Sequence, residues 1–186
     1  MAARGQSPQG AAPDGAERRS RLRQYQVQLL ERMQAAGSGA VDRSKRLGVM
    51  LGARRCLLDL TQVGEIAPAA GIVAVPLARD WYLGLCNIRG ALTGVIDLAR
   101  YQGEAGGAPG PDSRVVTFAP GLGFNCALLS GRVLGLRKPG EMAALAAPPG
   151  APAWAARRYR DADGQDWTGV DLALLVREAR FSDIGL

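Results

Sequence analysis

The side chains best suited to nucleophilic or metal chemistry are scarce in this chain of 186 residues. Histidine is absent, which excludes Ser-His-Asp and Cys-His nucleophile systems, histidine-ligated metals and histidine pH switches. The three cysteines, Cys56, Cys86 and Cys126, are widely separated, form no C-x-x-C pair and stand among apolar neighbours. We therefore expect buried free thiols in a reducing compartment, the cytoplasm.

The acidic run at residues 161–166, Asp-Ala-Asp-Gly-Gln-Asp, has the composition of a calcium loop. An EF-hand loop requires glycine at its sixth position and glutamate at its twelfth. Those positions hold Asp166 and Leu172 here, so the pattern fails. Asp163-Gly164 is instead typical of the turn of a β-hairpin, and we expect a strand on each side of it.

Patterns that bind phosphates or nucleotides are missing as well. Gly121-Leu122-Gly123 lacks the third glycine of a dinucleotide fingerprint, and no P-loop occurs. The remaining carboxylates are dispersed, and no local spacing is typical of an acid–base pair. The sequence therefore predicts a protein that has no catalytic residues, no cofactor and no metal, and that is not an enzyme.

The net charge of +6 suggests a nucleic-acid hypothesis, so its distribution along the chain matters. Residues 1–46 hold nine Lys/Arg and four Asp/Glu, whereas residues 47–186 hold fourteen and thirteen. A nucleic-acid-binding domain would carry the excess on its own surface. Only 5% of the residues are aromatic, and none form a cluster for base stacking. A small-barrel nucleic-acid-binding module therefore stays a distant alternative, and we expect no nucleic-acid partner.

Residues 1–39 are expected to form a basic extension that precedes the folded domain at residues 40–186. The first sixteen residues are rich in Gly, Pro and Ala and should be disordered. Between residues 17 and 36, Leu22, Tyr25, Leu29 and Met33 recur at helical spacing and predict one amphipathic helix. The Gly-Ser-Gly sequence at residues 37–39 ends it. This helix either docks on its own domain or binds a partner or an anionic surface.

From Arg46 onward the apolar residues follow a period of two, which is typical of strands. The alternating stretches are 47–51, 56–60, 92–98, 115–118 and 124–129. Many short strands at close spacing favour barrels or a sandwich. Residues 103–112 and 138–152 are expected to be loops. No apolar run reaches the roughly 18 residues of a membrane helix, so we expect no insertion into a membrane.

The end of the chain is expected to be helical. Thr168 and Asp171 form a T-x-x-D start signal, and Leu172, Leu175 and Val176 then repeat at helical spacing. A helix with this apolar face should pack on the strands that precede it.

The most informative stretch sets the polar residues Asn87 and Arg89 within apolar strands. Residues 84–90, Gly-Leu-Cys-Asn-Ile-Arg-Gly, are followed by Val-Ile-Asp-Leu at residues 95–98. Together they resemble the G-x-x-N-x-R-G…P-x-[IV]-D-L core of CheW-like coupling proteins. Residues 63–66, Val-Gly-Glu-Ile, are similar to the V-x-E-I segment of the same family. The resemblance covers about residues 45–186.

Two further features are similar to PilI, the CheW-like protein of twitching-motility systems. One is Asp80-Trp81, just before the core motif, and the other is the C-terminal pattern from Trp167 to Ile184. The sequence also departs from the family pattern at three positions. Gly94 replaces the proline of the core, and Ala127 and Gly131 replace a glycine and an aspartate in the segment that ends at Val133.

The resemblance implies an all-β fold with terminal helices, in which two small five-stranded SH3-like barrels share a hydrophobic core. It further implies a non-enzymatic adaptor that couples the cytoplasmic tips of chemoreceptors to a CheA-type histidine kinase. The similarity to PilI points to a signalling array that controls type IV pili and twitching motility. The alternative is a coupler of flagellar chemotaxis.

The same resemblance indicates which residues bind a partner or shape the binding surface. They are Val63, Glu65, Gly84, Asn87, Arg89, Gly90 and Val133. An arginine within apolar strands needs a carboxylate, and the family pattern places Glu65 across the same barrel from Arg89. We expect these two side chains to form a partly buried ion pair.

Overall fold

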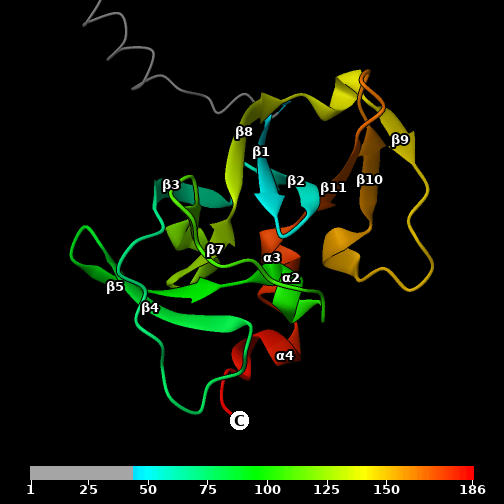
Figure 1. The fold of residues 1–186 in the computed structure, drawn as a ribbon. Helices are drawn as coiled ribbons and strands as arrows, with labels where there is room; N and C mark the ends of the chain where they lie inside the picture. Colours follow the sequence, from blue (N-terminus) through cyan, green and yellow to red (C-terminus); the bar gives the residue numbers. More distant parts are fainter. Residues whose placement is uncertain (1–43) are drawn as a thin grey trace, which may run out of the picture. The chain divides into compact units, whose positions relative to one another are not determined.

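The computed structural model describes residues 44–186, and Figure 1 draws the earlier residues as a thin grey trace. The expected extension at residues 1–39 and the amphipathic helix predicted within it lie outside the described residues. The domain boundary near residue 40 therefore stays a prediction. Within residues 44–186, no helix is long and apolar enough to cross a bilayer.

One sheet has six strands and is built from both ends of the described chain. Its strands, in the order in which they lie, are β8 (Arg132–Arg137), β1 (Arg46–Leu51), β2 (Arg54–Asp59), β11 (Asp166–Val170), β10 (Arg157–Arg160) and β9 (Ala143–Leu145). Neighbours run antiparallel except β2 and β11, which are parallel. The hairpin predicted at Asp163-Gly164 is confirmed, because β10 and β11 pair with Tyr159 opposite Trp167.

The other sheet has five strands from the middle of the chain. Their order is β3 (Val63–Pro68), β6 (Arg114–Phe118), β7 (Cys126–Ser130), β5 (Ala91–Ile96) and β4 (Tyr82–Ile88). Only β5 and β7 are parallel. The mostly β fold with two strand units is therefore confirmed, although one unit has a sixth strand. The extra strand, β9, lies inside the stretch expected to be a loop, where three residues pair with β10.

The helices are short, and α2 and α3 lie where the two sheets meet (Figure 1). The α-helices are α2 (Leu98–Tyr101), α3 (Leu172–Leu175) and α4 (Ala179–Ser182), and the 3-10 turns are η1 (Pro120–Leu122), η2 (Pro139–Glu141) and η3 (Ala153–Ala155). The prediction of a single C-terminal helix is wrong. Glu178 is extended, with φ −65° and ψ 126°, and separates α3 from α4. The N-cap is Asp171, because Thr168 lies within β11.

One hydrophobic core joins the two sheets, as the resemblance implied. Val49 and Leu58 of the six-stranded sheet share this core with Ile96, Val116 and Leu128 of the five-stranded sheet. A second, smaller core lies on the other face of the five-stranded sheet. Its buried members are Cys86, Ile88, Val95, Val115, Ala127 and Leu129. The central strands of this sheet are therefore apolar on both faces, which explains why their sequences alternate so weakly between apolar and polar residues.

The cysteines are free thiols, as predicted, with Cys56 and Cys86 buried and Cys126 half-buried. Burial raises the pKa of the Cys56 thiol from 9.0 to about 12, against the smaller opposing effect of Arg54 and Arg158. Burial likewise raises the pKa of Cys126 to about 11. Both sulfurs are therefore neutral at pH 8, and a neutral thiol is a poor nucleophile.

We expect native protein at pH 8 to leave Cys56 unmodified by iodoacetamide over hours, whereas all three cysteines react in urea. Mass spectrometry of the alkylated peptides measures this.

The raised pKa values also predict that the free energy of unfolding falls above pH 9, because the unfolded thiols lose their protons first. A rise in stability from pH 8 to pH 10 would contradict the burial of these thiols.

Candidate functional site

The turn between β4 and β5 presents the predicted residues at one end of the five-stranded sheet. Arg89 and Gly90 form a two-residue turn with positive φ angles of 49° and 90°, flanked by the Ile88–Ala91 pair. Positive φ at both positions is typical of a type I′ hairpin. Asn87 fixes this turn, since its Oδ1 accepts a hydrogen bond of 2.8 Å from the backbone N of Gly90.

An ion pair joins this turn to the opposite edge of the same sheet. Arg89 Nε lies 2.8 Å from Glu65 Oε2, and Glu65 belongs to β3, whereas the turn follows β4. Because β3 and β4 are the two edge strands, the sheet must curl until its edges approach each other. A register shift in β3 and a 2.7 Å hydrogen bond from Glu65 N to Thr117 Oγ1 position the carboxylate.

The predicted pairing of Arg89 with Glu65 is confirmed. The predicted partial burial holds for Glu65 but is wrong for Arg89. The Arg89 side chain is 85% exposed and that of Glu65 is 32% exposed. The guanidinium stays in water because Arg89 lies at the tip of the hairpin, beyond the last paired residues of both strands. An exposed pair contributes only about 0–1 kcal/mol to stability. The pair is therefore available for contact with another molecule.

The other predicted site residues support the fold from inside. Gly84 is buried, and a Cβ there would collide with the carbonyl oxygen of Val73. Val63 is half-buried against the shared core. Val133 is half-buried against it too, but it lies on β8 of the six-stranded sheet. The structure therefore brings four of the seven residues together at the turn: Glu65, Asn87, Arg89 and Gly90.

Two exposed apolar side chains flank these four residues, and the sequence analysis missed them. Ile66, next to Glu65, is 44% exposed, and Leu92, which pairs with Asn87, is 64% exposed. No signal in the sequence distinguishes them from buried strand residues. We call Glu65, Ile66, Asn87, Arg89 and Leu92 the hairpin surface. A charged pair beside exposed apolar groups is typical of a contact surface.

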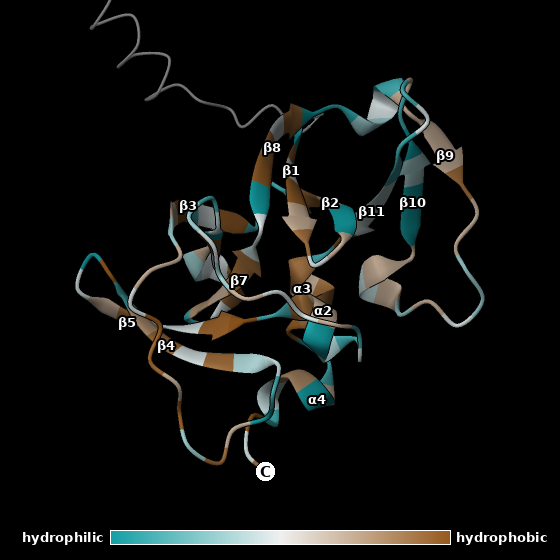
Figure 2. Ribbon diagram, viewed as in Figure 1, coloured by the Kyte–Doolittle hydropathy of each residue, from teal (hydrophilic) through white to brown (hydrophobic). Residues whose placement is uncertain are grey.

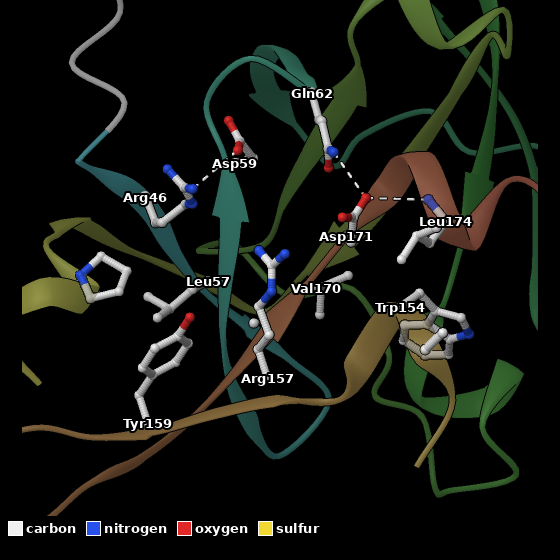
Figure 3. A pocket seen from close by; sticks show the side chains of 13 residues that line it. Arg46, Leu57, Asp59, Gln62, Trp154, Arg157, Tyr159, Val170, Asp171 and Leu174 are labelled. Atoms are coloured by element: carbon white, nitrogen blue, oxygen red, sulfur yellow. Dashed lines mark hydrogen bonds and ion pairs between the residues drawn. The ribbon is translucent and has the colours of Figure 1, made fainter. Parts of the chain in front are cut away.

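A second candidate is the small pocket between β2, β10, β11 and α3 (Figure 3). Arg46 Nη2 lies 3.2 Å from Asp59 Oδ2, and Gln62 Nε2 donates a 2.9 Å hydrogen bond to Asp171 Oδ1. Gln62 Oε1 accepts from the backbone N of Leu172 at 2.8 Å. The cavity measures about 60 Å³, enough for about two water molecules. The bonds of Gln62 to Asp171 and Leu172 join α3 to the sheet, so the pocket has a structural role.

Asp59 in this pocket stays ionised at neutral pH. Burial would raise the pKa of its carboxyl group, but the hydroxyl and amide of Thr61 donate hydrogen bonds to it. Together with the positive charges of Arg46 and Arg157, these bonds outweigh burial and lower the pKa. A carboxylate held in this way is suited to structure, not to proton transfer. Among residues 44–186, no group of three His, Cys, Asp or Glu residues is placed to hold a metal ion.

Comparison with known proteins agrees with this geometry. The structure superposes on the crystal structure of the scaffolding protein TtCheW from Thermoanaerobacter tengcongensis with a TM-score of 0.61 and 21% sequence identity, over 74% of this chain and 94% of that one. No protein of curated function matches the sequence. Residues 45–180 match the model of the CheW-like domain. The chain therefore belongs to the CheW-like domain family.

Proposed function

We propose that this protein is a non-enzymatic adaptor that couples the cytoplasmic tips of chemoreceptors to a CheA-type histidine kinase. Membership of the CheW-like family supports a role in chemosensory signalling, and the similar TtCheW is described as a scaffolding protein. The observation that carries the proposal is the exposed Arg89–Glu65 pair. Such a pair adds little to stability, so its geometry is best explained by contact with a partner.

The adaptor acts through its surfaces. The hairpin surface binds the kinase or the receptor, while Gly84 and Val63 hold the strands that present it and Val133 packs against the shared core from the other sheet. Signals then reach the kinase because receptor states differ in their free energy of contact with the adaptor. The expected absence of catalytic residues and cofactors fits this mechanism, and the expected location is the cytoplasm.

We further propose that the array controls type IV pili. The support is the sequence similarity to PilI at Asp80-Trp81 and along the C-terminal segment. Trp81 is 1% exposed and stacks with Phe181, with ring centroids 6.3 Å apart. The features that resemble PilI therefore pack the C-terminal segment onto the domain. The genes beside this one would decide between pilus control and flagellar chemotaxis.

Isothermal titration with a CheA-type kinase and a receptor cytoplasmic fragment from the same organism tests the adaptor proposal. We expect Arg89→Ala and Glu65→Ala each to weaken association with one of them about tenfold, or about 1.4 kcal/mol. The melting temperature should hardly change, because the pair is exposed. The double variant should bind little worse than either single variant, since both remove the same contact.

The matched control is Arg177→Ala. Arg177 is also an exposed arginine, but it follows α3 and lies outside the hairpin surface. The Arg177→Ala variant should bind both partners like the wild type. Normal binding by Arg89→Ala, or fully additive losses in the double variant, would refute the role of the pair.

A further inference from the structure

Positive charge gathers on one of the two sheets. The six strands of β8-β1-β2-β11-β10-β9 carry eight arginines and two aspartates. The five strands of the other sheet carry one arginine and one glutamate. Figure 2 shows β10 mostly in teal, the colour of hydrophilic residues. Residues 47–186 are almost neutral in sum, so this separation of charge belongs to the fold.

Arg158 on β10 has a buried guanidinium nitrogen that lacks an acceptor in the described part of the chain. Its side chain is only 24% exposed, yet its Nε is buried and has no hydrogen-bond partner among residues 44–186. The nearest carboxylate is that of Asp166, whose Oδ2 lies 4.0 Å from Arg158 Nη2. Arg160 already binds both oxygens of this carboxylate, at 2.7 and 3.2 Å. Burial of a donor without an acceptor is unfavourable, so an acceptor that reaches the guanidinium of Arg158 would be stabilising.

The exposed part of Arg158 lines a cleft of about 490 Å³ between β2, β10 and the loop before η3. Arg54 and Arg55 line the same cleft. Arg54 is paired with Glu104. Arg55 forms no hydrogen bond or close ion pair within residues 44–186, although its charge helps to lower the pKa of the Asp161 carboxyl group. Asp166 also lines it, but Arg160 neutralises its charge. The cleft therefore has an excess of positive charge.

The other wall of the cleft is apolar. It is made by the loop residues Pro148, Pro149, Gly150, Ala151 and Pro152. Pockets for small molecules measure about 300–1,000 Å³ and combine apolar walls with a few polar groups. The volume is therefore too large for a bare ion and suits an organic body that carries an anionic group.

We propose that this cleft binds a small organic anion, whose carboxylate or phosphate oxygens face the guanidinium of Arg158. The proline-rich loop covers the organic part of the ligand, and Arg55 adds a further positive charge. Guanidinium groups bind both kinds of oxyanion through two parallel hydrogen bonds. This site lies on a different sheet from the hairpin surface, so its failure would leave the adaptor proposal unaffected.

Titration of the full chain with citrate and with pyrophosphate at low ionic strength tests the site. We expect at least one of them to bind, and Arg158→Gln to weaken that binding tenfold or more, as befits a charge-assisted hydrogen bond. Citrate binding alone assigns a carboxylate ligand, pyrophosphate binding alone assigns a phosphate ligand, and binding of both supports a site open to either. Arg55→Gln should weaken binding about threefold through its charge.

Arg177→Gln, on the chain after α3, is the matched control and should bind like the wild type. Because Arg158→Gln could disturb the fold, the wild-type protein provides a second measurement. The ¹⁵Nε–H signal of Arg158 should shift as the bound anion is added, while that of Arg177 should not. The proposal is overturned if neither anion binds, if Arg158→Gln binds unchanged, or if Arg177→Gln loses as much affinity.

Discussion

Gly84→Ala should destabilise the domain by about 2–6 kcal/mol. Gly84 has a φ angle of +131°, a backbone conformation that costs other residues about 1–3 kcal/mol. A Cβ would also collide with the Val73 carbonyl oxygen. Val73 cannot move away freely, because it exchanges backbone hydrogen bonds of 2.8 and 2.9 Å with Leu85. Overpacking of this kind adds about 1–3 kcal/mol. Urea unfolding followed by circular dichroism measures the loss.

Gly90→Ala separates the two causes of this loss. Gly90 also has a positive φ, +90°, but no atom of residues 44–186 lies within 4 Å of the added Cβ. Only the cost of the positive φ remains, so we expect the free energy of unfolding to fall by about 1 kcal/mol. Equal losses at both glycines would mean that the contact with Val73 has no effect on stability.

Phe181→Ala should have a comparable effect, with a loss of about 3–5 kcal/mol. Phe181 is 1% exposed, although it lies only a few residues from the C-terminus. Its ring centroid lies 6.0 Å from that of Phe118, 5.9 Å from that of Tyr101 and 5.9 Å from that of Phe124. Removing the ring opens a cavity among aromatic groups that belong to both the middle and the end of the chain. Thermal unfolding measures the change.

Hydrogen exchange of one backbone amide shows whether the lost stability arises in the C-terminal segment. The backbone N of Arg79 donates a 2.9 Å hydrogen bond to the Ile184 carbonyl. In Phe181→Ala the Arg79 amide should exchange with solvent faster than in the wild type. Leu186→Ala is the control, because Leu186 is 83% exposed and its truncation should change stability by no more than about 0.5 kcal/mol. A similar loss in both variants would contradict the role of the aromatic cluster.

Local patterns in the sequence were enough to predict most of the strands. The alternation at residues 47–51 and 115–118 corresponds to β1 and β6, and Asp163-Gly164 forms the predicted hairpin turn, with a φ of +74° at Gly164. These signals work because a strand face and a tight turn each depend on a few adjacent residues. The resemblance to the CheW-like family predicted the fold and the Arg89–Glu65 pair, and local sequence patterns could have predicted neither.

Features that depend on distant residues could not be predicted. The exposure of Arg89 follows from its place at the tip of a curled sheet, whereas its apolar neighbours in sequence suggested burial. The strand β9 has only three residues and exists because β10 offers a free edge. The basic six-stranded sheet arises because β2 and β10, about a hundred residues apart, bring their arginines into one sheet. Sequence counts alone show a nearly neutral domain.

The parallel pairing of β2 with β11 also has a consequence for synthesis on the ribosome. A nascent chain that has emerged up to residue 130 already contains every strand of the five-stranded sheet. The β2 strand, made much earlier, has only β1 beside it until residue 170 emerges. Closing the long loop between β2 and β11 costs conformational entropy before any contact between these strands offsets it. The six-stranded sheet is therefore completed only after residue 170 has emerged.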